Sequence, residues 1–207
     1  MRLRSAFIWL AFLFFVLEAR GSVSGSDPLD SLLTQLSVEK QDSVKLRLLA
    51  ALSELCEENE ILTYAMPALD LADKLLLSVT TGKANILKYK ADALNNIGFV
   101  HMNHGNNRGA LDNFTKSLNL RKEIKDQVGI ASSLNNIASI YRLLGNIDLA
   151  LENYERALKI QEEINDKQGI SISLNNLGVL WLNKNDYSKA LTYYQRGLEL
   201  QEELGNK

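Results

Sequence analysis

The chain has 207 residues, of which 46% are apolar, with 25 acidic and 23 basic side chains and one cysteine. This composition is typical of a folded protein of one or two domains, or of a short repeat array. The near balance of charge provides no basic excess for binding nucleic acid, and the single cysteine excludes an internal disulfide.

The first 21 residues differ in composition from the rest of the chain. Two arginines within the first four residues precede twelve uninterrupted apolar residues, 6–17. This apolar run is short for a membrane-spanning helix, which needs about 20 residues. A basic start, a short apolar segment and then small residues predict a secretory signal peptide over 1–21, cleaved after Gly21 or Ser24, with a retained anchor as the alternative. We therefore expect an exported protein, periplasmic or extracellular, with no stable membrane span after cleavage.

The segment before residue 91 is predicted in two parts. Residues 22–35 contain the letters SGSDP and predict a flexible lead. Residues 36–90 carry apolar residues at helical spacing and are predicted as a degenerate form of the repeat that follows. In this alignment Cys56 takes the position of Gly98, so we interpret it as a buried structural thiol.

The rest of the chain repeats itself with a period of forty residues. Placing 91–130 on 131–170 without gaps gives 16 identities in 40 positions, and placing 131–167 on 171–207 gives 13 in 37. A fixed period of this length indicates a solenoid, in which each unit buries its apolar face against its neighbours. We predict three units, 91–130, 131–170 and 171–207.

Within a unit the apolar spacing is that of two helices. The middle unit has one apolar stripe at i, i+3, i+4 and i+7, formed by Leu134, Ile137, Ala138 and Tyr141. Gly145 and Asn146 then interrupt the pattern, and a second stripe begins at Ala150. The unit is therefore predicted as a helix, a tight turn and a second helix.

Small and aromatic residues recur at fixed positions of these helices. The sets are Gly98, Ala138 and Gly178 in the first helix, and Ala110, Ala150 and Ala190 followed by Phe114, Tyr154 and Tyr194 in the second. The pattern resembles the tetratricopeptide repeat, in the forty-residue variety found in kinesin light chains and bacterial sensor proteins. The resemblance implies an all-α fold, a right-handed superhelical solenoid of stacked antiparallel helix pairs. It also implies that the residues beyond the usual thirty-four mostly lengthen the second helix.

No catalytic or metal-binding set of residues is predicted. The two histidines, His101 and His104, can supply at most two ligands, whereas a zinc site needs three or four. The glutamates at the end of each second helix are interpreted as solvated faces. Asn113 begins a glycosylation sequon that matters only in a secreted eukaryotic protein. We predict a protein that is not an enzyme and takes no cofactor and no metal.

The resemblance places one face of the first helices on the inner curve of the solenoid, as a groove for a partner. The predicted groove residues are Asn95, Asn96, Phe99, Met102, Asn135, Asn136, Ser139, Arg142, Asn175, Asn176, Val179 and Leu182. The asparagines are expected to form two ladders, 95–135–175 and 96–136–176, whose amides bind either a peptide backbone or the neighbouring helices. Arg142 is the one basic residue of this face, which argues against a clamp for a C-terminal carboxylate.

We therefore predict an exported, non-catalytic scaffold that binds a protein or an extended peptide in the groove, and no nucleic acid. The alternative is the sensory input region of a bacterial membrane signalling protein, a histidine kinase or transcriptional regulator whose output part is separate. The last second helix, with Leu191, Tyr194 and Leu198, is expected to leave an apolar flank that pairs with another copy or a downstream domain.

Overall fold

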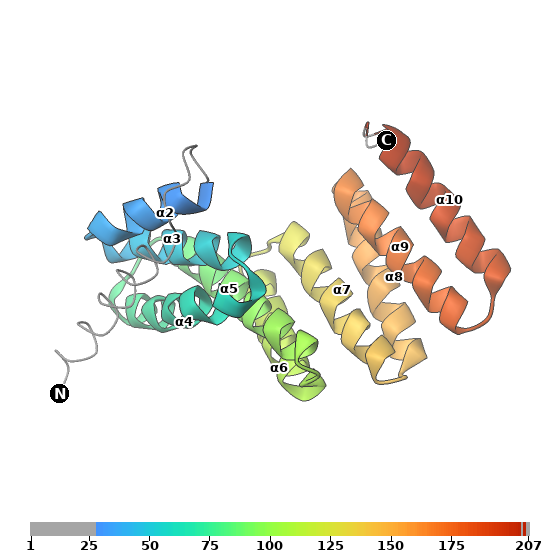
Figure 1. Ribbon diagram of the computed structural model, residues 1–207, viewed down its shortest axis with the longest axis horizontal. Coiled ribbons are helices and arrows are strands. Elements are labelled where there is room, and N and C mark those ends of the chain that lie inside the picture. The colour runs from blue at the N-terminus through green and yellow to red at the C-terminus, as the bar shows by residue number, and fades with distance from the viewer. Residues whose placement is uncertain (1–27, 204, 206–207) are drawn as a thin grey trace.

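A computed structural model describes residues 28–203 and residue 205, and the helices follow one another as an elongated array (Figure 1). The predicted signal peptide, 1–21, and the predicted lead from 22 to 27 lie outside the described residues. The helices are α2 (Pro28–Val38), α3 (Asp42–Leu55), η1 (Glu58–Glu60), α4 (Ile61–Ser78), α5 (Lys83–Asn103), α6 (Asn107–Glu123), α7 (Gln127–Leu143), α8 (Ile147–Glu163), α9 (Lys167–Asn183) and α10 (Tyr187–Glu203). Residues 28–203 contain no strand, which confirms the predicted all-α class. Within the same residues, no helix has both the length and the apolar content that a membrane span requires.

Short turns with one left-handed residue separate the helices of the three predicted repeats. Gly105, Gly145 and Asn185 have φ values of 72°, 77° and 59° within the pairs, and Lys125 and Asn165 have 58° and 57° between them. A left-handed residue just after a helix lets the next amides bond back to its last carbonyls, which ends the helix without orphaned groups. The chain therefore reverses after each helix and stacks α5 to α10 as antiparallel neighbours.

The first helices of the middle and last units begin four residues earlier than the predicted units. Helix α7 starts at Gln127 and α9 at Lys167, so the boundaries at 131 and 171 fall inside first helices. The starts are set by Asp126 and Asp166, which accept hydrogen bonds from the amides of Gly129 and Gly169, each 3.0 Å long. Self-alignment fixes the period of forty residues but not the point in the period at which a helix begins.

The expected extension of the second helix is also wrong. Helices α7 and α8 each contain 17 residues, as do α9 and α10. The two helices of the middle unit are therefore equal in length, as are those of the last unit, and each presents nearly five turns to its neighbours.

The N-terminal part of the described chain corrects two predictions. Residues 28–35 belong to α2 and are not a flexible lead, because Leu29, Leu33 and Leu36 pack into the first core cluster. Cys56 follows the end of α3 and is only half-buried, so it does not occupy the interior helical position of Gly98. Within 36–90, the range of the predicted degenerate unit, α3 and α4 pack against each other and against α5.

The core confirms the predicted contact of small and aromatic residues. A Cβ at Gly98 would lie 2.7 Å from the Phe114 ring, and one at Gly178 would lie 2.6 Å from the Tyr194 ring. Phe114 and Tyr154 are almost completely buried, whereas Tyr194 in the last helix is only partly covered. Each ring therefore fills the space that a residue with little or no side chain leaves on the first helix of its pair.

Candidate functional site

The asparagines of α5 and α7 form a hydrogen-bonded relay within the fold. The Nδ2 atom of Asn136 donates to Oδ1 of Asn95 over 2.7 Å. Asn95 in turn donates to Asn96 over 3.4 Å, and Asn96 donates to Oγ of Ser53 on α3 over 2.8 Å. These amides therefore join three first helices, α3, α5 and α7, and bind one another in the way that part-buried amides usually do.

Asn135 has a different partner and lies out of reach of a ligand. Its side chain is 6% exposed, and its Nδ2 atom donates to Oγ of Ser173 on α9 over 2.9 Å. Ser173 also donates to Oε1 of Gln161 on α8 over 2.5 Å. The predicted ladders 95–135–175 and 96–136–176 are therefore not formed, since neighbouring helices bring unlike positions together.

Asn175 and Asn176 lie on α9, the first helix of the last unit, and their amides remain available. Asn175 is exposed and Asn176 is half-buried, and neither makes a side-chain hydrogen bond within residues 28–203. The equivalent position in the preceding unit, Asn135, is covered by α9, whereas no described helix follows α10. The position of the unit in the array thus decides whether the same asparagine holds the fold or faces solvent.

The remaining predicted groove residues differ from unit to unit. On α9, Leu182 is 41% exposed and Ile172 is 49% exposed, and Val179 is half-buried. On α5, Phe99 is 41% exposed, and the half-buried Met102 packs against the second core cluster.

The middle unit offers a more polar part of this face. On α7, Oγ of Ser139 bonds the Asn135 carbonyl over 3.1 Å and the Tyr154 hydroxyl over 2.8 Å. Arg142 is half-buried and pairs with no acidic group in residues 28–203. The exposed apolar side chains of the face therefore lie on α5 and α9.

A buried ionic cluster at the joint of α5, α6 and α7 was not predicted. Arg121 is 8% exposed, and its guanidinium donates to Asp92 over 2.6 Å and to Asp126 over 2.8 Å. Burial raises the pKa of Asp92, and the positive charge of Arg121 opposes that rise. A Cβ at residue 129 would collide with the guanidinium, so the glycine there makes room for the arginine. Sequence reading missed the cluster because arginine is usually a surface residue, although the position that Arg121 shares with Gln161 lies on the apolar stripe of the second helix.

The described residues offer little for catalysis. No group of three or more histidine, cysteine, aspartate or glutamate side chains gathers within 28–203 in a way that could hold a metal ion. His101 is half-buried, with Nδ1 3.2 Å from Nδ2 of Asn106, and His104 is exposed at the end of α5. Glu162 pairs with Arg196 on the surface, as predicted for a solvated face.

The glycosylation sequon lies in the middle of α6. The amide of Asn113 donates to the Gly109 carbonyl over 2.8 Å, one turn earlier in the same helix, and is partly buried. The nitrogen that a glycan would occupy is thus engaged by the backbone of the folded chain.

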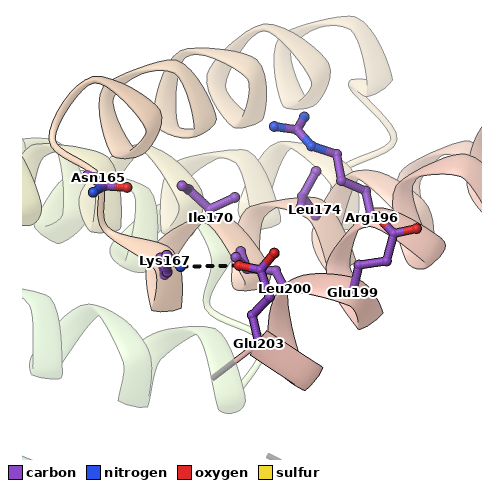
Figure 2. Close-up of a pocket in the computed structure, with 8 residues that line it drawn as sticks. All are labelled: Asn165, Lys167, Ile170, Leu174, Arg196, Glu199, Leu200 and Glu203. Atoms are coloured by element: carbon purple, nitrogen blue, oxygen red, sulfur yellow. Dashed lines mark hydrogen bonds and ion pairs between the residues drawn. The ribbon is translucent and has the colours of Figure 1, made fainter. Parts of the chain in front are cut away.

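A pocket of about 230 Å³ opens between the start of α9 and the end of α10 (Figure 2). Ile170 and Leu174 contribute its apolar side, and the Lys167–Glu203 ion pair of 3.1 Å crosses its mouth. Its volume lies below the roughly 300 Å³ at which small-molecule sites usually begin. Sequence reading gave no signal for this pocket.

Several solved structures share this fold at low sequence identity. A Rap protein complexed with Competence and Sporulation Factor is 21% identical, with a TM-score of 0.68, covering 84% of this chain and 48% of that one. A signal transduction ATPase with a tetratricopeptide repeat sensor from Pyrococcus horikoshii is 18% identical, with a TM-score of 0.69 and coverages of 96% and 30%. A kinesin light chain from Podosopora anserina, with nearly identical repeats, is 14% identical, with a TM-score of 0.54 and 86% of each chain covered. The chain therefore spans less than half of the length of the first two structures.

The sequence itself, as well as the fold, identifies the family of the chain. No curated protein matches. The sequence model of the tetratricopeptide repeat matches residues 89–163 and again 129–203, which together make more than half of the chain. With the helix pairs, the small–aromatic contacts and the forty-residue period, this match shows that the chain belongs to the tetratricopeptide repeat family.

Proposed function

We propose that this chain is a non-catalytic scaffold that binds an extended peptide segment of a partner along the exposed face of α9. The observation that carries the proposal is the combination of Asn175, whose amide is unused within residues 28–203, with exposed Ile172 and Leu182 on the same helix. The exposed amide can form hydrogen bonds with the backbone of a bound peptide, while the apolar side chains of α9 cover apolar side chains of the same peptide.

The middle of the face is less suited to contact a partner. Asn135 and Asn136 are bonded to neighbouring helices, and only Arg142 offers a basic group there. A single arginine does not provide the set of cations that would make a terminal carboxylate essential. The partner segment is therefore expected to bind through its backbone and apolar side chains, with or without a free C-terminus.

Support for a binding role comes from the fold. The Rap protein of similar fold was solved in complex with Competence and Sporulation Factor, so an array of this kind holds another molecule. A structural likeness at 21% identity carries no information about which molecule this chain binds.

The test is a selection of ten-residue random peptides on the full chain, followed by affinity measurement with a selected synthetic peptide. We expect Asn175→Ala and Ile172→Ser each to weaken binding about tenfold, which corresponds to about 1.4 kcal/mol. The matched control is Asn119→Ala, an exposed asparagine on α6, which should leave the affinity unchanged. Equal affinity of all three variants would contradict the assignment to α9, and loss of binding on amidating the peptide C-terminus would favour a carboxylate clamp.

Export is part of the same proposal, on the basis of the basic start and short apolar run of residues 1–21. N-terminal sequencing of the chain isolated from its own cells should begin after residue 21 or 24. A chain that retains Met1 would contradict cleavage and leave the anchor as the alternative.

The second candidate function is the sensory input region of a larger signalling system. It is favoured by the ATPase whose tetratricopeptide repeat array is described as a sensor, and of which this chain covers 30%. Genes that adjoin this one distinguish the two functions: an adjoining membrane protein with a kinase or DNA-binding output would favour the sensor.

A further inference from the structure

The outer face of α10 has lost the cover that its equivalents have in the two preceding units. Leu118 on α6 is 7% exposed and Leu158 on α8 is 8% exposed, whereas Leu198 on α10 is 57% exposed. Leu118 packs in one core cluster with Ile130 of α7, and Leu158 packs in another with Leu174 of α9. On α6 and on α8 this face is covered by the first helix of the next unit, whereas on α10 it is open.

The opposite end of the array is closed and does not match this open face. Helix α2 turns Leu29, Leu33 and Leu36 inward, and its outward side carries exposed Ser31 and Thr34. Such a polar outer face is what a terminal cap of a solenoid provides. Head-to-tail stacking of copies would place the apolar face of α10 against this polar surface, so it is disfavoured.

Helix α10 can instead match itself in the antiparallel direction. Its exposed apolar residues Tyr187, Leu191 and Leu198 recur at i, i+4 and i+11, which places them on one face of the helix. Reversal of the helix about a point between residues 194 and 195 brings Leu191 opposite Leu198 of the second helix, and Leu198 opposite Leu191. The apolar pairs then repeat on both sides of a two-fold axis, as an isologous interface requires.

The charges of α10 also favour this direction. The half from 187 to 194 carries Lys189, which pairs with Asp186 of its own chain, and the half from 196 to 203 carries one arginine and three glutamates. Parallel pairing sets the two acidic halves side by side, whereas antiparallel pairing sets each acidic half beside a half without free charge. Repulsion between like charges across a helix pair therefore disfavours the parallel direction.

We propose that α10 is a self-association surface, which pairs antiparallel with α10 of a second copy of this chain. The pairing uses the end of the solenoid at which Asn175 is also exposed, but it is argued from the residues of α10 alone, so its test is separate from that of the proposed function.

The first test measures the mass of the full chain in solution over a range of concentrations, for example by sedimentation equilibrium. We expect the wild type to approach twice the mass of one chain, and Leu198→Glu to raise the dissociation constant at least about tenfold because it buries two symmetric carboxylates. The matched control is Leu77→Glu, which changes a leucine that is 91% exposed on α4 and should leave association unchanged. A wild type that stays monomeric, or association that survives Leu198→Glu, would overturn the proposal.

The second test fixes the direction of pairing by oxidative cross-linking in a Cys56→Ser background. Gln195 lies next to the two-fold axis, so Gln195→Cys should form an intermolecular disulfide, for which the two Cβ atoms must come within about 4.5 Å. Ser188 is exposed on the same side of α10 but two turns from the axis, which separates its two copies by about 20 Å along the helices. Ser188→Cys should therefore not cross-link. Cross-linking at both positions would show parallel pairing, and cross-linking at neither would contradict contact through α10.

Discussion

The joint of α5, α6 and α7 contains one positive and two negative side chains that pair with one another, largely shielded from water. Arg121 bonds Asp92 and Asp126, and its Nε atom also lies 3.3 Å from Oγ of Ser117. Asp126 bonds the first turn of α7 as well, so one carboxylate links the guanidinium to the start of the next helix. In the following unit the equivalent residue is Gln161, which accepts a hydrogen bond from Ser173, so the equivalent joint is held by uncharged side chains.

Replacing Arg121 with methionine should lower the free energy of unfolding by about 3–5 kcal/mol, because it leaves the buried Asp92 without its cationic partner and removes the ion pair with Asp126. Arg156→Met on α8 is the matched control, since that side chain is 51% exposed and pairs loosely with Glu152 at 3.7 Å. Its effect should stay below about 1 kcal/mol. Urea unfolding followed by circular dichroism measures both, and equal losses would contradict a structural role for the buried cluster.

The raised pKa of Asp92 makes a separate prediction about pH. Burial favours the protonated carboxyl in the folded chain, so the folded protein binds this proton more readily than the unfolded chain. At neutral pH, burial of the ionised Asp92 carboxylate therefore lowers the free energy of unfolding. This loss of stability disappears as the pH falls through the raised pKa of the folded chain toward the ordinary value of 3.8.

Unfolding free energies of the wild type and Asp92→Asn, measured at pH 7 and again near pH 4, test this direction. On going to the lower pH, the free energy of unfolding of the wild type should rise relative to that of Asp92→Asn. The rise should be about 1.4 kcal/mol for each unit by which the pKa is raised. A move in the opposite direction would mean that the attraction of Arg121 outweighs burial and lowers the pKa.

At the scale of helices, one repeated asparagine has two roles. Asn135 and Asn175 occupy the same position in α7 and α9 within identical LNN triplets. Asn135 is covered by α9 and bonds Ser173, whereas Asn175 is exposed. The sequence could predict that these residues lie on the first helices. It could not predict which amides are used within the fold, because that depends on the helix that packs next to them.

Alanine at these two positions should separate the roles. Asn135→Ala removes one of the two partners of the buried Ser173 hydroxyl, the one that donates to it, and should cost about 1–3 kcal/mol of stability. Asn175→Ala changes an exposed side chain and should shift stability by no more than about 0.5 kcal/mol. Thermal unfolding of the two variants side by side measures the contrast, and similar losses would show that Asn175 is also held within the fold.

For the whole molecule, the forty-residue period predicted the fold class, the tight turns and the small–aromatic contacts. The period alone did not predict the starts of the helices, because the capping residues Asp126 and Asp166 set them. It also missed α2, since the run of Ser, Gly, Asp and Pro before Leu29 is typical of a loop, although the leucines that follow have helical spacing. Features outside the repeated positions were thus the ones that needed the structure.

A solenoid is held together by contacts between neighbours, so its local stability should follow how well each end is covered. Helix α8 buries side chains toward α7 and α9, including Tyr154 and Leu158, whereas the buried residues of α10 are Ala190 and Gly197. In the monomer, the backbone amides of α10 should therefore exchange with solvent faster than those of α8. Hydrogen exchange followed by mass spectrometry measures this difference directly.

Hydrogen exchange measured over a range of protein concentrations distinguishes an exposed α10 from one that pairs with a second copy. If α10 pairs with a second copy, its amides gain protection as the protein concentration rises, because association stabilises the folded helix by mass action. The amides of α8 lie within the array and should change much less. In Leu198→Glu the protection of α10 should stay low at every concentration, while Leu77→Glu should behave as the wild type. Protection of α10 that equals that of α8 even in dilute Leu198→Glu would contradict both the open end and its role in pairing.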